Sequence, residues 1–199
     1  ELSTWIVKSF ENIAVSSETK TELKKDDKTP DKLKDADLTE ISFAAKIEEG
    51  KLKPLKGEDS LIFTYLPTKV LEFGFPFLVN GSFITNAARE GLHEDRAWNQ
   101  WLFQLVAEKL IDWLASFATS KLKYQILQLL PQKFNSHHNE LKKAFDEAIE
   151  QAMQVKPFVL SKNSRVKKVA DLIVDKTGLS ELDFVSSEVV ISYINDQEK

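Results

Sequence analysis

The sequence has no cysteine and little glycine or proline. The lack of cysteine excludes disulfide bonds, thiolate nucleophiles and zinc sites with cysteine ligands. It also fits a reducing compartment, and we predict a cytoplasmic location. Only 6 glycines and 6 prolines occur among 199 residues, whereas 42% of the residues are hydrophobic. This composition is typical of a chain with a packed core and argues against global disorder.

The chain also lacks a basic excess and a long apolar run. Its formal net charge is −4, so we expect no nucleic acid partner, because such proteins carry concentrated positive charge. No apolar run approaches the roughly 20 residues of a membrane span, and no signal peptide opens the chain. We therefore expect no membrane partner. The first residue is Glu1, and we expect the chain to be a fragment of a larger protein.

Several sequence motifs of catalysis and nucleotide binding are missing as well. No Gly-Lys-Ser or Gly-Lys-Thr sequence is present for a phosphate-binding loop, and no two glycines stand two positions apart, as a dinucleotide fingerprint requires. A Gly-x-Ser-x-Gly nucleophile elbow is also absent. We therefore predict no self-contained catalytic site in this chain, whether or not the parent protein is an enzyme.

The three histidines give no convincing metal site. His137 and His138 are adjacent, so on a helix they would point in different directions, and no third ligand has a suitable spacing. We predict no metal and assign both to a polar surface. The cluster His93-Glu94-Asp95 has an acid–base or metal interpretation, but we favour the acidic first turn of a helix, where carboxylates stabilise the positive end of the helix dipole.

The first half of the chain favours extended structure. Stretches rich in β-branched and aromatic residues predict strands at 4–15, 41–47, 61–66 and 75–84. Asn80-Gly81 is a common turn or bulge sequence, so we expect two short pieces in the last stretch. Residues 16–40 alternate Lys with Asp and Glu, which predicts a long solvated loop, with a charged docking segment as the alternative.

The second half favours helices. Apolar residues recur every three or four positions over 98–117, which predicts a long amphipathic helix whose tryptophans pack in the core; a ligand-stacking platform is the less favoured interpretation. A second helix is expected to begin near Ser136 and end before Pro157. Further predictions are a short strand at 158–160, a helix over 166–174 closed by Gly178, and a helix rather than a strand over 188–194.

One block of short motifs resembles a known family. It contains Leu66-Pro67, then Val79-Asn80-Gly81-Ser82-Phe83, then Asn86-Ala87-Ala88-Arg89-Glu90-Gly91-Leu92, then Trp98-Asn99. This order is similar to the sacsin repeat. Sacsin-like proteins carry an ATP-binding domain of the GHKL type, related to the ninety-kilodalton heat-shock chaperones. The resemblance extends over about residues 41–117.

The resemblance implies a functional arginine. In the related chaperones, an Asn-x-Ser-Arg-Glu-x-Leu-Gln stretch of the middle domain supplies an arginine that reaches the γ-phosphate of ATP held by the preceding domain. Asn86, Arg89, Glu90 and Leu92 match that stretch, whereas Ala88 and His93 depart from it. Asn86 and Arg89 are therefore the expected nucleotide-sensing residues, acting in trans to a missing domain. A free, exposed Arg89 with few structural partners is expected.

The predicted fold class is α+β, with a transducer-like open sheet and a long packed helix over residues 1–120 and a mainly helical region over 121–199. Transducer domains of the resembled family contain a βαβ unit with a left-handed crossing. The predicted function is coupling the nucleotide state of a missing N-terminal ATPase domain to a protein partner or client. ATP and magnesium would belong to that domain, and this chain would hold no cofactor. The alternative is a nucleotide-independent interaction module.

Overall fold

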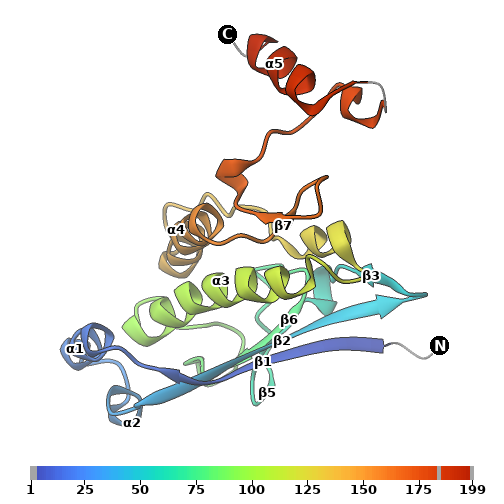
Figure 1. The fold of residues 1–199 in the computed structure, drawn as a ribbon. Helices are drawn as coiled ribbons and strands as arrows, with labels where there is room; N and C mark the ends of the chain where they lie inside the picture. Colours follow the sequence, from blue (N-terminus) through green and yellow to red (C-terminus); the bar gives the residue numbers. More distant parts are fainter. Residues whose placement is uncertain (1–3, 183–184, 198–199) are drawn as a thin grey trace.

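A computed structural model describes residues 4–182 and 185–197. Helices α3 and α4 are stacked in two layers over one face of a mixed sheet (Figure 1). The elements are β1 (Thr4–Ala14), α1 (Ser17–Lys25), α2 (Asp31–Lys34), β2 (Leu38–Glu48), β3 (Lys51–Lys53), β4 (Ile62–Thr64), β5 (Leu66–Pro67), β6 (Leu78–Gly81), α3 (Ala97–Phe117), α4 (Glu140–Val155), β7 (Val159–Leu160), β8 (Val166–Lys167) and α5 (Ser187–Gln197). Short 3₁₀ turns cover Gly57–Asp59, Lys123–Leu129, Val169–Asp171 and Leu179–Glu181.

The sheet is open, and its strands follow the order β1-β2-β6-β4-β5. Strand β3 pairs with the C-terminal end of β2. Only β4 and β6 run parallel among the described pairs, and residues 65–77 join them without a helix. The α+β class is confirmed. The described residues contain no βαβ unit, so the crossing found in transducer domains is not part of this sheet.

Residues of alternating burial on β2 explain how the sheet meets α3. Ile41, Phe43 and Ala45 are buried, whereas their neighbours on β2 face the other side of the sheet and are more exposed. The Phe43 ring stacks on Trp113 of α3 with centroids 5.3 Å apart. Ring contacts of this kind add about 0.5–1.5 kcal/mol to the stabilisation from burial.

The prediction of a long core helix is confirmed. Trp98, Leu102 and Leu105 are buried, and Trp101 and Phe117 are half-buried against the same core. The second side of α3 is covered by α4, which contributes Leu141, Phe145 and Ile149 to the core. The core therefore includes residues on both sides of position 120, although the division of the chain into two regions there stays a prediction.

Residues 16–40 are not the predicted loop. They form α1, α2 and the first three residues of β2. The prediction was wrong because charge alternation along the exposed side of α1 concealed a buried residue. The Ser16 hydroxyl caps α1 by accepting a hydrogen bond from Thr19 N (3.1 Å), and Leu23 is fully buried in the core. An amphipathic helix with a narrow apolar stripe exposes mostly charged residues.

Asn80-Gly81 is not a turn either. Both residues lie inside β6, where Asn80 pairs with Ser42 and Gly81 pairs with Ile41. A Cβ atom at Gly81 would stand 3.0 Å from Ile41 Cδ1. A larger residue at this position would require the Ile41 side chain to shift by a few tenths of an ångström, so the glycine reflects a close approach and not a turn.

The C-terminal predictions are partly correct. The short strand β7 and the helix α5 are confirmed, but the helix over 166–174 was wrong. Val166 and Lys167 instead form β8, whose pairing with β7 satisfies backbone groups that a helix would have used internally. The N-cap of α4 is Asn139, whose side chain accepts from Lys142 N, and Ser136 caps the turn before it.

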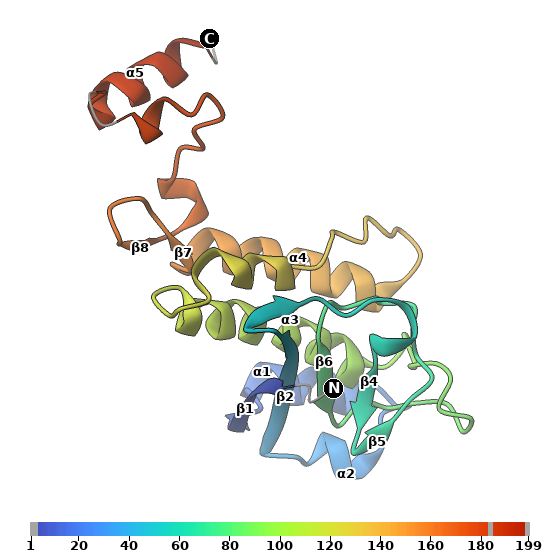
Figure 2. The same ribbon diagram turned by 90° about the vertical axis from the view of Figure 1, so that its right-hand side faces the viewer.

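The arm that follows β8 stands away from the body. Figure 2 shows α5 at the end of an extended connection, far from α3 and the sheet. None of the described helices is long and apolar enough to cross a membrane.

Candidate functional site

Arg89 lies in a tight turn between β6 and α3, and its backbone is in the left-handed region with φ of +58°. Its Nη2 atom donates to Thr64 O (3.1 Å), Thr64 Oγ1 (2.7 Å) and Leu66 O (2.8 Å). Its carbonyl accepts from Lys69 N (2.8 Å). The side chain therefore joins its own turn to the β4–β5 hairpin.

Asn86 builds the same turn. Its Oδ1 accepts from Glu90 N (3.0 Å), its backbone N–H donates to Gly91 O (3.0 Å), and its carbonyl accepts from Arg89 N (3.0 Å). Glu90 also forms an exposed ion pair with Lys69 (2.8 Å); the hydrogen bond from Lys69 holds the pKa of Glu90 below its usual value.

The expectation of a free Arg89 was wrong. Its Nη2 is bound to the protein, and its Nε is buried without a hydrogen-bond partner among the residues that the structure describes. A bidentate contact with phosphate oxygens needs two neighbouring guanidinium nitrogens directed at the ligand. In this conformation Arg89 offers no such pair. The assignment of Arg89 and Asn86 as nucleotide-sensing residues stays a prediction.

The hairpin that Arg89 holds presents an exposed tyrosine. Tyr65 lies between the two residues whose carbonyls Arg89 binds, its φ is +65°, and 81% of its surface is accessible. Its N–H donates to Asn80 Oδ1 (3.1 Å). A left-handed non-glycine residue costs on the order of 1–2 kcal/mol. Arg89 and Asn80 offset that cost with hydrogen bonds and thereby fix the tyrosine outside the sheet.

Tyr65 borders a shallow cavity of about 390 Å³, whose lining extends from α2, β1 and β2 to β6 and to Trp98 at the start of α3. Outward-facing Asn80 and Glu40 line it, together with Lys32 of α2 and Glu11 of the irregular part of β1. None of these three charged residues makes an ion pair with a described residue. Two carboxylates and one ammonium give the cavity a small negative excess. This charge disfavours binding of a polyphosphate and is compatible with contact to a partner protein.

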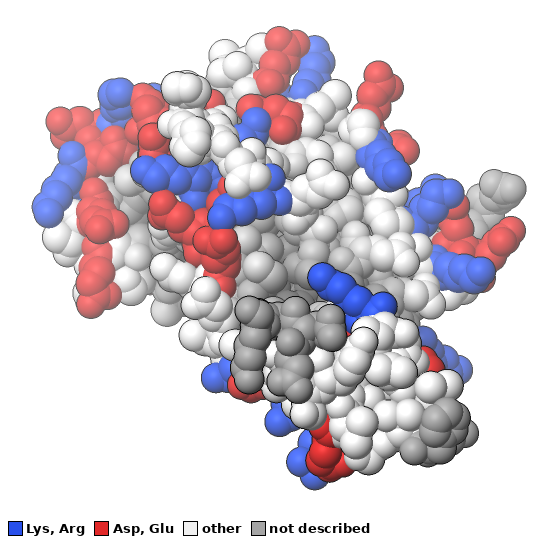
Figure 3. Space-filling model, turned by 90° about the horizontal axis from the view of Figure 1, so that it is seen from above, with Lys and Arg blue, Asp and Glu red and all other residues white. Residues whose placement is uncertain are grey.

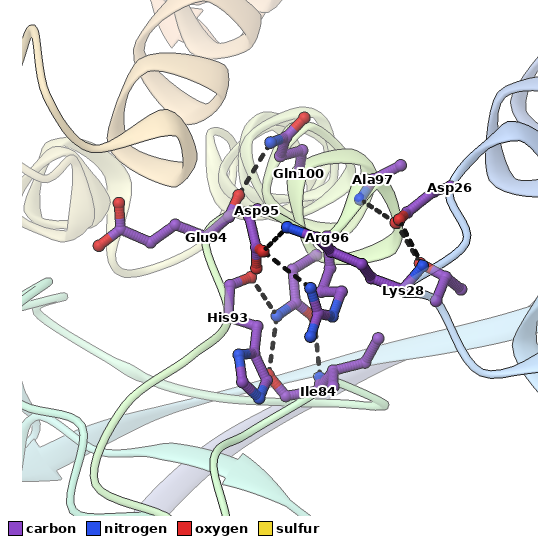
Figure 4. A network of polar contacts seen from close by, with 11 residues as sticks. Asp26, Lys28, Ile84, His93, Glu94, Asp95, Arg96, Ala97 and Gln100 are labelled. Carbon is purple, nitrogen blue, oxygen red and sulfur yellow. Dashed lines mark hydrogen bonds and ion pairs between the residues drawn. The ribbon is translucent and has the colours of Figure 1, made fainter.

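The residues 93–95 serve a different purpose from the one predicted. They precede α3, which begins at Ala97, so they are not its acidic first turn. The carboxylate near that helix start belongs to Asp26, whose Oδ2 accepts from Ala97 N (3.0 Å) and from the Thr29 hydroxyl (2.6 Å) (Figure 4). Burial opposes ionisation of Asp26, but these hydrogen bonds lower its pKa overall.

The neighbouring charges in Figure 4 connect the segment after α1 to the residues before α3. Asp95 pairs with Lys28 (2.6 Å) and Arg96 (2.8 Å), and the hydrogen bond from Lys28 lowers the pKa of Asp95. The Asn99 side chain donates to the carbonyls of Ile84 (2.8 Å) and His93 (2.9 Å). Apart from the pair of adjacent residues Asp95 and Arg96, these contacts link separate segments of the fold, which argues for a structural network.

The pKa of Glu94 is shifted in the opposite direction to those of Asp26 and Asp95. Burial and the nearby charge of Glu72 raise its pKa, although Lys142 partly offsets them. Its Oε1 accepts a hydrogen bond from Asn139 Nδ2 (2.7 Å), which links it to the start of α4. Among the residues that the structure describes, no three His, Cys, Asp or Glu side chains gather into a group that could hold a metal.

Comparison with known proteins gives one relative. Protein NO VEIN of Arabidopsis thaliana is 32% identical to this chain over 88 residues, which are 43% of this chain and 3% of that protein. The chain therefore spans a very small part of the length of the relative. No known family profile matches the chain, and no solved structure matches it.

Sequence reasoning found Arg89 and Asn86 but missed Tyr65 and Asp26. Tyr65 stood inside the strand predicted over residues 61–66. Asp26 stood inside a charge-rich stretch in which no single carboxylate was distinguishable. Leu66-Pro67, which follows Tyr65 directly, was the available sign of a strand break, because proline restricts the residue before it and cannot donate to a ladder.

Proposed function

We propose that this chain is a non-catalytic coupling region of a larger, chaperone-like GHKL-type protein, and that it docks its ATP-binding domain through the surface around Tyr65. The observation that carries the proposal is the strained, highly exposed tyrosine beside a cavity. Backbone strain of this kind is maintained where the surrounding structure enforces it, and it concentrates at functional positions. Exposed tyrosines are also frequent anchors of protein interfaces.

Two further observations support this role. The motifs between Leu66 and Asn99 resemble those of sacsin-like proteins, and the relative with the 88-residue match is a far longer chain. The cavity carries Glu11 and Glu40 against the single cation Lys32, so a direct contact with ATP phosphates is disfavoured. Arg89 acts in this proposal as the residue that positions Tyr65, and nucleotide state is sensed through the docked domain.

The test uses the purified chain and the separately purified ATP-binding domain of its parent protein. Calorimetric titration in the presence of a non-hydrolysable ATP analogue should show binding, and ADP should weaken it. Tyr65→Ala should lower the affinity about tenfold or more, since an interface anchor contributes about 2 kcal/mol or more. Tyr124→Ala removes another exposed tyrosine and should have no effect.

The outcomes separate the two candidate functions. Binding that depends on Tyr65 but not on nucleotide would favour the alternative, an interaction module that works independently of ATP. Binding unaffected by Tyr65→Ala would mean that the surface around Tyr65 is not the docking site.

A further inference from the structure

A second surface, unrelated to the Tyr65 cavity, concentrates positive charge. Residues 156–170 contain five Lys or Arg residues and no Asp or Glu, although the whole chain has a net charge of −4. Lys156 is paired with Asp112 (2.7 Å). The other four cations lie on the β7–β8 hairpin or directly after it, and none makes an ion pair with a described residue; they are Lys162, Arg165, Lys167 and Lys168.

An apolar groove of about 440 Å³ lies between this hairpin and α5. Leu160, Ile173 and Ile191 are among its apolar lining residues, and Lys162 and Lys167 stand at its hairpin side. Seen from above, the projecting lobe that carries α5 shows mostly uncharged side chains (Figure 3). The groove thus combines an apolar floor with a cationic border.

The acidic residues of the groove do not cancel that border. Asp175 accepts hydrogen bonds from the Thr177 hydroxyl (2.5 Å) and from the backbone N–H groups of Gly178 and Ser180. These bonds, led by that of Thr177, lower its pKa strongly, so Asp175 keeps its negative charge. Asp171 is the other carboxylate of the lining. Four cations, Lys162, Arg165, Lys167 and Lys168, stand against these two carboxylates, so an excess of two positive charges remains on and directly after the hairpin.

Helix α5 exposes several of its apolar side chains to solvent. Val190 and Ile194 are buried, but Val189, Ile191 and Tyr193 on its other sides are exposed. The apolar face of a helix is usually buried against another part of the fold, and these three exposed side chains extend beyond the buried face of α5. A partner that lies in the groove would cover part of this surface.

We propose that the groove between the β7–β8 hairpin and α5 binds a segment of a partner protein that carries apolar side chains flanked by carboxylates. The apolar side chains fill the groove, and the carboxylates meet the hairpin cations. A nucleic acid backbone would use the cations but leave the groove empty. A bilayer takes up protruding apolar side chains and has none to insert into a concave groove.

The test uses the full chain and a short fluorescein-labelled peptide of Glu and Leu in helical spacing, followed by fluorescence anisotropy. We expect saturable binding that weakens as sodium chloride is raised. Replacing every Leu of the peptide by Ser, or every Glu by Lys, should abolish it. The double variant K162E/K167E should lower the affinity about tenfold or more, which corresponds to about 1.4 kcal/mol.

A matched control reverses two exposed lysines elsewhere. K24E/K25E changes the net charge equally but lies on α1, away from the groove, and should bind the peptide as the unmodified chain does. Equal losses in both double variants would mean a general charge effect and would overturn the proposal. So would a lack of peptide binding, or preferred binding of a labelled RNA or of phosphatidylserine vesicles. Ile191→Ser should weaken binding of the peptide and leave binding of the RNA unchanged.

Discussion

At the scale of the residue, the hydrogen bonds of Arg89 make it a structural side chain. Hydrogen bonds from a charged donor contribute about 1.5–3 kcal/mol each and are not additive when they share one nitrogen. We therefore expect Arg89→Ala to lower the free energy of unfolding by about 2 kcal/mol in chemical denaturation. Arg165, an exposed arginine without an ion pair to a described residue, is the control, and its replacement by Ala should change stability by no more than about 0.5 kcal/mol. An unchanged denaturation curve for Arg89→Ala would restore the free arginine of the sequence-based hypothesis.

Glu94 and Glu90 should respond to pH in opposite directions. The pKa of Glu94 is raised in the folded chain, so its contribution to stability is present below its unfolded pKa and is lost as the pH rises. Glu94→Gln keeps an acceptor for Asn139 and should raise the melting temperature at pH 7, with the gain vanishing near pH 4. The pKa of Glu90 is lowered, so Glu90→Gln should lower the melting temperature at pH 7 and have no effect in acid. Thermal melts of both variants across this range check the signs, and a common sign for the two would contradict the assignment.

At the scale of the element, α3 is the part that the sequence predicted best, because its apolar period is long and regular. The prediction did not rank its tryptophans, since burial depends on what packs against each position. Trp113 contacts Phe43 and Phe77 and is fully buried, whereas Trp101 lies at the margin of the core. Trp113→Ala should therefore cost about 3–5 kcal/mol and Trp101→Ala clearly less.

Trp113 allows a finer test, because its indole N–H is buried and has no hydrogen-bond partner in the described part of the chain. Trp113→Phe removes that donor while keeping an aromatic ring, so it should cost much less than Trp113→Ala. The measurement is the midpoint of denaturant unfolding for the three variants. Equal losses of unfolding free energy for Trp101→Ala and Trp113→Ala would mean that α3 is rotated about its axis relative to the core described above.

Short elements show why sequence reasoning ended where it did. Helix α1 has one fully buried residue, Leu23, and its other contacts depend on partners far away in the sequence, such as Asp26 with Ala97. Strand β8 and the residues after it were predicted as a helix because Val166, Val169 and Ala170 fit a helical period. The candidate site was found only through the Asn86–Leu92 resemblance. Its exposed residue, Tyr65, became visible once the positive φ angle and the contacts of Arg89 were known.

At the scale of the whole molecule, the distribution of buried side chains divides the chain into a body and an arm. The core cluster extends from Val15 to Phe158, with Val159 and Val166 packed against it as half-buried residues. Beyond Val166, the fully buried apolar residues of the described chain are Val190 and Ile194. Local opening requires little free energy where few apolar contacts must break. The body should thus unfold as one cooperative unit, and α5 should open far more readily.

Hydrogen exchange read by mass spectrometry tests this division in the intact chain. Amides of β2, α3 and α4 should exchange only through global unfolding, at a rate that follows the stability measured in denaturant. Amides of α5 should exchange orders of magnitude faster, since its opening free energy lies well below the global value. Addition of the acidic Leu-rich peptide should slow exchange in α5 and β7–β8 and leave β1 and β4–β5 unchanged, because binding stabilises only the elements that contact the ligand. Exchange in α5 as slow as in α3 would mean that α5 is already stably packed in the free chain, which would contradict the proposal that a partner segment covers its exposed apolar side chains.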